Sequence, residues 1–215
     1  MTDIHMKKAV RLINKARELG KTLLDLSDLE IQEIPKELLE LADTLEGLDV
    51  SETNIADISS LANLTKLKWL YFHHTNVSDI SSLANLTKLK ALSLWKTRVS
   101  DISSLANLTN LKKLILSDTN VTDISSLANL TNLEWLYLWR TGISDISPLA
   151  NLTKLEELCL DFTNVSDLSP LANLTNLEEL DLLGCPLVAS AANIQALKKL
   201  RENGCEIFGV EEFMK

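Results

Sequence analysis

The sequence predicts an α/β solenoid in which short strands form a parallel concave β-sheet and short 3₁₀ or helical turns form the convex side. The first observation is a frame that runs from Leu45 to Asn176 and repeats every 22 residues, the spacing between Leu45 and Leu67. Each copy reads L-x-x-L-x-L-x-x-T-x-[VI]-x-D-[IL]-S-[SP]-L-A-N-L-T-x, with Val50 and Phe72 as variants at the sixth position. The copies begin at Leu45, Leu67, Leu89, Leu111, Leu133 and Leu155.

Two further observations indicate that the first half of each copy forms a strand and the second half forms the convex turn. The leucines at the fourth and sixth positions, such as Leu92 and Leu94, lie two residues apart and therefore on one face of a strand. The serine that follows D-[IL], Ser59 in the first copy, is expected to be the N-cap of the convex turn. Pro148 and Pro170 follow this serine in two copies and favour the first helical position. Few residues remain before the next strand, so the turn is expected to be 3₁₀ or a single helical turn.

Two polar columns accompany the apolar pattern. We expect the aspartates to accept hydrogen bonds from nearby backbone amides, because stacked like charges would otherwise repel one another. We expect the threonines at the ninth position, Thr53 through Thr163, to link neighbouring turns as a structural ladder. The aspartate column consists of Asp57, Asp79, Asp101, Asp123, Asp145 and Asp167.

A fixed period of about 20 to 29 residues with this leucine spacing is typical of a leucine-rich repeat. The regular coils resemble the internalins of bacterial surfaces, a 22-residue class. The segment TLLDLSDLEIQEIPKELLEL, residues 22–41, resembles the opening coil of bacterial repeat proteins that include those attached to Roco GTPases. The internalin resemblance implies a scaffold that binds a protein through its concave face. The near-identity of the coils also fits a consensus-designed array without a natural ligand.

The whole chain, residues 1–215, is expected to form one leucine-rich repeat domain. Apolar residues at helical spacing predict an N-terminal capping helix, and a second helical pattern from Ser190 to Asn203, with Ile194 facing inward, predicts a C-terminal cap. The expected parts are a capping helix at 1–20, a divergent first coil at 21–44, six regular repeats at 45–176, a last coil and helical cap at 177–209, and a tail at 210–215.

Composition excludes several classes of partner and location. Asp and Glu number 30 against 21 Lys and Arg, which disfavours nucleic acid. The chain has no run of about 18 apolar residues, so no membrane insertion is expected. Residues 1–20 carry charges throughout and resemble no signal peptide, so a cytoplasmic location is expected, with export only if a signal has been lost. The three cysteines are expected to be reduced thiols, with a Cys185–Cys205 pair as the alternative, and the protein is expected to be a monomer.

The copies differ from one another mainly at positions 3, 5, 7, 8 and 10, which leave the concave face or the loop after each strand. All four tryptophans and both tyrosines of the chain fall at these positions. Aromatic side chains on a rigid sheet are common anchors of a binding surface. The predicted partner-binding residues are Trp69, Tyr71, His73, His74, Trp95, Lys96, Arg98, Lys113, Trp135, Tyr137, Trp139, Arg140 and Phe162.

The spacing of the large residues predicts the shape of the binding surface. Trp95 and Trp139 lie two coils apart, which is about 10 Å, with Ser117 between them. Together with Ala91 and Ser93, this serine is expected to line a notch. Basic residues occupy the central coils and acidic residues occupy both ends, so the surface suits an extended protein or peptide segment with apolar and acidic groups.

Three other interpretations of these residues stay open. The aromatic side chains could stack on one another only to stabilise the sheet, or they could stack on a carbohydrate. An enzyme is disfavoured, because the candidate groups lie on an open, solvated surface without an enclosing pocket. No catalytic residue, metal site or cofactor is therefore predicted. The groups considered for catalysis are His73, His74, Ser93, Asp118 and Cys159.

Overall fold

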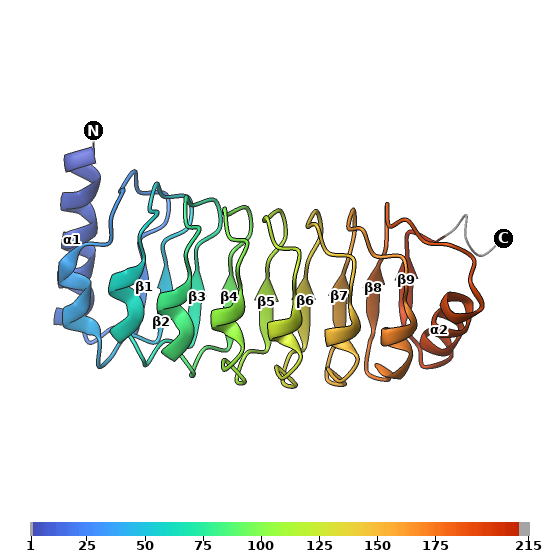
Figure 1. Ribbon diagram of the computed structural model, residues 1–215. Coiled ribbons are helices and arrows are strands. Elements are labelled where there is room, and N and C mark those ends of the chain that lie inside the picture. Colours follow the sequence, from blue (N-terminus) through green and yellow to red (C-terminus); the bar gives the residue numbers. More distant parts are fainter. Residues whose placement is uncertain (1, 211–215) are drawn as a thin grey trace.

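The computed structural model describes residues 2–210 and confirms the predicted solenoid (Figure 1). Helix α1 (Thr2–Glu18) covers one end of a row of coils, and helix α2 (Ala191–Glu202) covers the other. Within the described residues, nine parallel strands form one sheet in chain order. These strands are β1 (Leu23–Asp25), β2 (Gly47–Asp49), β3 (Trp69–Tyr71), β4 (Ala91–Ser93), β5 (Lys113–Ile115), β6 (Trp135–Tyr137), β7 (Glu157–Cys159), β8 (Glu179–Asp181) and β9 (Glu206–Phe208).

Strand register follows the repeat frame without a shift. Leu70 of β3 pairs with Leu92 of β4, and the third and fifth positions of each coil pair with the same positions of the next. The leucine at the centre of each strand from β1 to β8 is buried, so the residues on either side of it point away from the core. We call the surface formed by these outward residues and the loops that follow the strands the sheet face. It corresponds to the concave face of the prediction.

One continuous apolar core runs through the described residues, from Ala9 in α1 to Val210 after β9. Each buried leucine or isoleucine contributes about 1.5–3 kcal/mol, so stability accumulates from coil to coil. Val210 is only 3% exposed, and it therefore packs in the core instead of starting the predicted tail. The rest of that tail, residues 211–215, lies outside the described residues.

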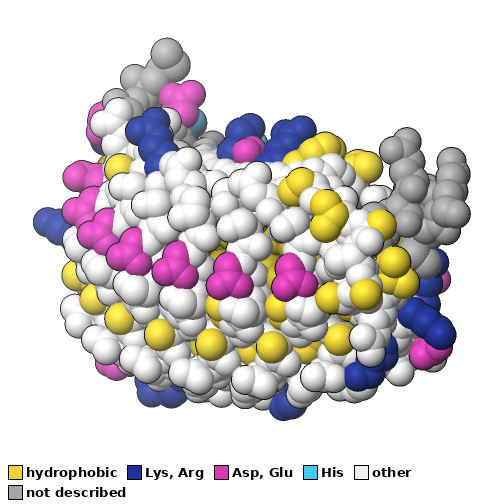
Figure 2. Space-filling view, turned by 45° about the vertical axis from the view of Figure 1, so that its right-hand side comes forward, with side chains coloured by type: hydrophobic (Ala, Val, Ile, Leu, Met, Phe, Trp, Pro, Cys, Tyr) yellow, Lys and Arg dark blue, Asp and Glu magenta, His cyan; other side chains and the backbone are white. Residues whose placement is uncertain are grey.

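The opposite side of the solenoid, which we call the turn side, carries the 3₁₀ helices that the frame predicts (Figure 1). The aspartate column is confirmed as a set of backbone acceptors, because Asp101 Oδ1 accepts the Ser103 N–H at 2.8 Å and the other five copies do the same. Figure 2 shows a regular row of acidic side chains along this side, as one per coil requires. The 3₁₀ helices are Lys36–Leu41, Ser59–Asn63, Ser81–Asn85, Ser103–Leu105, Ser125–Leu127, Ser147–Leu149 and Ser169–Asn173.

Two expectations for the polar residues are wrong in detail. Ser59 is the first residue of its 3₁₀ helix and not the N-cap, because the aspartate two residues earlier already satisfies its amide. Each buried threonine hydroxyl donates to a carbonyl of its own coil, and only Thr163 also reaches the next coil, at 3.5 Å from Cys185 Sγ. Thr97 Oγ1, for example, donates to the Leu94 carbonyl at 2.7 Å. Backbone bonds join the turns instead, such as that from the Arg98 N–H to the Val77 carbonyl at 2.9 Å.

Both terminal helices are tied to the coils that they cover. Gly20, at φ 59°, reverses the chain after α1 in the left-handed region that glycine adopts without strain. The buried Asn193 of α2 accepts the Leu168 N–H at 2.8 Å and donates to the Ser166 carbonyl at 2.8 Å. Ile194, predicted to face inward, is 46% exposed instead. Among the described residues, no helix is both long enough and apolar enough to span a membrane.

Candidate functional site

The centre of the sheet face carries two identical aromatic strands. Trp69 and Tyr71 lie on β3, and Trp135 and Tyr137 lie on β6, each half-buried and pointing away from the core. Lys113, on β5 between them, holds its Nζ 5.3 Å from the Tyr137 ring centroid, within the range of a cation–π contact. These five predicted residues therefore share one surface of paired strands.

A second aromatic group, in the loops that follow the strands, forms a row along the sheet face. Trp95 contacts His74 edge-on at 4.5 Å between ring centroids and stacks on His73 at 5.8 Å. On its other side it contacts Trp139 at 6.1 Å. Arg140 extends the row, with its guanidinium carbon 5.6 Å from the Trp139 ring and 5.8 Å from the ring of Phe162, which is 51% exposed.

This row replaces the notch that the spacing predicts. The rings of Trp95 and Trp139 lean toward each other over Ser117, which is fully buried, so the gap of about 10 Å expected from two coils is closed. Ala91 and Ser93 are also buried, at 8% and 4% exposure. The stacking interpretation therefore accounts for this row, whereas the aromatic residues on β3 and β6 have no ring–ring contact with described residues.

Two predicted residues stand apart from both groups. Lys96 and Arg98 are exposed in the loop after β4, and among described residues neither makes an ion pair or a cation–π contact. Of the other basic residues, Lys112 pairs with Glu134 at 2.5 Å. The basic centre of the face is therefore carried by Lys96, Arg98, Lys113 and Arg140.

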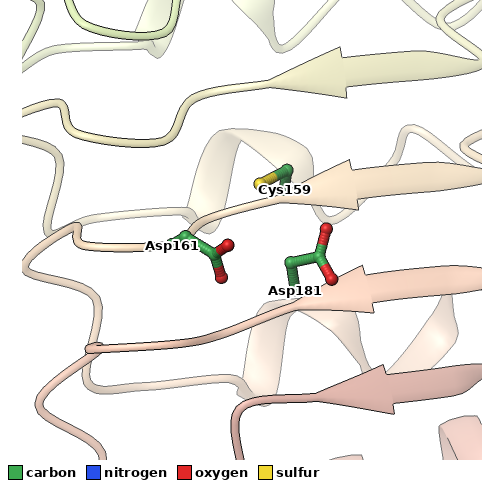
Figure 3. Close-up of side chains that lie close together, drawn as sticks. All are labelled: Cys159, Asp161 and Asp181. Atoms are coloured by element: carbon green, nitrogen blue, oxygen red, sulfur yellow. The ribbon is translucent and has the colours of Figure 1, made fainter.

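The C-terminal part of the sheet face is acidic. Figure 3 shows Cys159 and Asp181 on the neighbouring strands β7 and β8, with Asp161 just beyond the end of β7. Burial and the charge of Asp161 raise the pKa of Asp181, and burial and Asp181 raise that of Glu179. Toward the centre, Tyr137 donates a hydrogen bond to Glu157 Oε2. Burial, followed by this bond, raises the pKa of Tyr137 and keeps the phenol protonated.

Cys159 has the wrong environment for a nucleophile. The thiol and the two nearest carboxylates place their polar atoms within 4.8 Å of one another. Burial, reinforced by the Asp161 charge, raises the pKa of Cys159 to about 12, so almost no thiolate exists at neutral pH. The histidines considered with it, His73 and His74, belong to the aromatic row at Trp95. The geometry therefore gives no nucleophile–base pair here. In the described part of the chain, none of the three cysteines forms a disulfide.

A pocket of about 450 Å³ that the sequence did not predict lies at the N-terminal end of the sheet face. Strand register places Leu23, Gly47 and Trp69 in one row across β1, β2 and β3. Gly47 carries no side chain, and Leu23 leans over its backbone: a Cβ there would lie only 2.5 Å from Leu23 Cδ2 and 3.5 Å from Trp69 Cε3. The parallel row consists of Asp25, Asp49 and Tyr71, which also line the pocket. Gly47, a glycine at the third position of the frame, is the signal that could have revealed it.

Comparison with known proteins supports the fold and the class. The profile of Leucine Rich repeats (2 copies) matches residues 65–107, 87–129, 109–151, 131–173 and 153–201. The structure of internalin C2 from Listeria monocytogenes is 31% identical, with a TM-score of 0.80, over 86% of this chain and 86% of that one. No curated protein matches the chain significantly.

Two further solved structures show the same architecture. An internalin from Listeria monocytogenes, inlF, is 27% identical over 95% of this chain and 74% of its own, with a TM-score of 0.67. A leucine-rich repeat protein of Leptospira interrogans has a TM-score of 0.71 at 23% identity, over 90% of this chain and 56% of that one, and shares the fold. The repeat profile spans more than half of the chain and the internalin C2 similarity spans most of it, so this chain belongs to the leucine-rich repeat family as an internalin-like bacterial protein.

Proposed function

We propose that the protein is a non-catalytic scaffold that binds an extended protein segment across its sheet face. Leucine-rich repeat proteins are typically protein-binding modules, and the similarity to internalins agrees with that role. The observation that carries the proposal is the repeated Trp-Leu-Tyr of β3 and β6. These strands present two half-exposed aromatic pairs on one rigid sheet, three strands and roughly 14 Å apart.

The residues between the two strands suit a chain that crosses them. The outward residues of β4, Ala91 and Ser93, are small, so they leave the flanking aromatic side chains standing above the sheet. Lys113 on β5 adds a positive charge beside Tyr137. A segment with apolar side chains and an acidic group would therefore meet aromatic anchors and an opposite charge on the same surface.

The test compares wild type with a Trp69→Ala/Trp135→Ala variant. Proteins captured from the native host would be identified by mass spectrometry, and the captured partner would be purified and its affinity measured by calorimetry. We expect the double variant to bind it at least about tenfold more weakly, because central aromatic residues carry much of an interface's energy. Equal affinity for both proteins would overturn the proposal.

The matched control is Lys66→Ala/Lys88→Ala. Both lysines are exposed and lie between a 3₁₀ helix and the next strand, off the sheet face. This variant should keep wild-type affinity. Trp95 and Trp139 are less suitable test positions, because their replacement would also remove the packing of the aromatic row.

For the compartment, we infer a cytoplasmic location from the three unpaired cysteines, since reduced thiols persist in a reducing environment. Fractionation of the native host with an antibody against the chain would check this. Recovery of the protein at the cell surface or in the medium would contradict it.

A further inference from the structure

The pocket of β1, β2 and β3 combines an apolar wall with an acidic rim. Leu23, 59% exposed, and Trp69 form the wall, and the Leu23 side chain leans over the backbone of Gly47. Asp25 and Asp49 are paired across β1 and β2, so their Cα atoms lie about one strand spacing, roughly 4.8 Å, apart and both side chains leave the same face of the sheet. A ligand in this pocket would therefore meet hydrophobic surface along its length and two negative charges at the rim.

Both carboxylates are held in place and still have acceptor capacity. Asp25 Oδ1 accepts the Ser27 N–H at 2.9 Å, and Asp49 Oδ1 accepts the Ser51 N–H at 2.9 Å. Among the described residues, no donor binds the second oxygen of either carboxylate, and neither forms an ion pair. The two oxygens are therefore oriented before any ligand arrives.

The lysine beside Trp69 is already neutralised. Lys68 Nζ lies 5.8 Å from the Trp69 ring centroid, but it bonds to Glu46 Oε1 at 2.6 Å. On the next strand, Tyr71 completes the acidic row, and burial together with the Asp49 charge raises the pKa of its phenol. Tyr71 therefore stays neutral, and the charge of this row comes from the two aspartates alone.

We propose that this pocket receives an arginine side chain of the bound protein segment. The methylene stem would pack on Leu23, and the planar guanidinium would stack on Trp69. Its forked donors can bridge two carboxylates that stand one strand apart, which the single ammonium of lysine does less well. The proposal rests on the proposed function, because it takes the arginine from the protein segment that crosses the sheet face.

The experiment uses small probes and so needs no partner. Nα-acetyl-arginine methylamide and the neutral citrulline analogue, which has nearly the same shape, are titrated separately into the full chain. Backbone amide signals of residues 23–25, 47–49 and 69–71 are followed by NMR. We expect saturable shifts with the arginine probe at millimolar concentrations and at least about tenfold weaker binding of the citrulline probe.

Two variants locate the binding. Asp25→Asn/Asp49→Asn keeps the oxygen that accepts the serine amide while removing both charges, and it should reduce arginine binding at least about tenfold. The control Asp57→Asn/Asp79→Asn makes the same charge change in the same kind of turn on the turn side, and it should bind like wild type. Equal binding of both probes, or wild-type binding by the first variant, would overturn the pocket assignment.

The pocket and the proposed function can fail separately. Absence of saturable shifts at residues 23–25 and 47–49, with partner binding that still depends on Trp69 and Trp135, would remove the pocket and leave the scaffold function. Arginine binding in the pocket, with a partner affinity that is unchanged by replacement of Trp69 and Trp135, would remove the proposed scaffold function and leave the pocket as an arginine site.

Discussion

Carboxylates on the two sides of this solenoid differ in how their charges are satisfied. On the turn side, Asp57, Asp79, Asp101 and Asp145 each accept a hydrogen bond from a serine amide, which lowers the pKa. On the sheet face, burial raises the pKa of Glu179 and Asp181, and each is surrounded by further acidic groups. On the turn side each carboxylate is thus satisfied within its own coil, whereas the acidic part of the sheet face holds charges that no described residue neutralises.

This difference shows which contacts determine the residues on each side of the solenoid. A turn-side residue contacts its own coil and the next one. These contacts are the same in every coil, so the same residues recur. A sheet-face residue contacts mainly solvent and its lateral neighbours. Five successive strands therefore carry different residues at one position: Trp69, Ala91, Lys113, Trp135 and Glu157. Variation between copies of one repeat is therefore greatest where a partner would bind.

The largest expected effect contrasts one residue from each side. Leu127 is fully buried in a 3₁₀ helix of the turn side, and Leu127→Ala should destabilise the protein by about 3 kcal/mol, because the cavity cannot collapse in a tightly stacked coil. Ile115→Ala, on the half-buried sheet face, should cost about 1 kcal/mol. Urea denaturation followed by circular dichroism measures both. Equal losses would show that the two sides are packed alike.

A second prediction divides the sheet face itself. Trp95 contacts two histidine rings and Trp139, so Trp95→Ala should destabilise the fold by about 2 kcal/mol, less than the loss of a fully buried tryptophan. Trp69, which has no ring–ring contact with described residues, should cost about 1 kcal/mol or less on replacement by alanine. Thermal unfolding of both variants decides the matter. A larger loss for Trp69→Ala would mean that the strand aromatics, and not the loop row, hold the face together.

The third prediction follows from pKa values that are raised for the sheet-face carboxylates and lowered for the turn-side carboxylates. Charged Asp181 and Glu179 are disfavoured in the folded state, so they cost stability above their raised pKa values, and this cost disappears as pH falls through those values. The turn-side aspartates contribute stability above their unfolded value of 3.8, and this contribution is lost as pH falls through their lowered pKa values. Stability should therefore rise on mild acidification and fall at stronger acidity.

Urea midpoints measured from roughly pH 2.5 to 7.5 would trace this curve. In Glu179→Gln/Asp181→Asn the rise on mild acidification should shrink, with higher stability than wild type at pH 7. In Asp57→Asn/Asp79→Asn the loss in strong acid should shrink instead. We expect both changes to be smaller than that of Leu127→Ala, because these carboxylates are largely solvated. An unchanged pH profile in either variant would contradict the assignment.

How much the sequence could predict depends on how far each feature follows the frame. The strands, the core and the 3₁₀ turns were predictable, because the leucine spacing recurs in every coil. The contact between Trp95 and Trp139 was not, since spacing gives about 10 Å and the rings close that gap by leaning over Ser117. The pocket of β1, β2 and β3 was not predicted, because it depends on how Leu23 lies over Gly47 and on the register with β1, which lies outside the frame.

The smallest expected effect concerns the column of residues at the eighth position of each coil, whose shared backbone conformation the repeat pattern does not predict. The eighth position of each coil adopts positive φ, between 53° and 58°, in residues other than glycine such as Lys96, and Gly184 holds the matching position in the last coil. A non-glycine residue there carries strain of about 1 kcal/mol, partly offset by the greater freedom of glycine in the unfolded chain. Lys96→Gly should therefore stabilise the protein by about 0.5 kcal/mol. Lys90→Gly, a matched exposed lysine outside this column, should destabilise it by a similar amount. Chemical denaturation of the pair checks the sign, and a loss of stability in both would show that the left-handed turn is not strained.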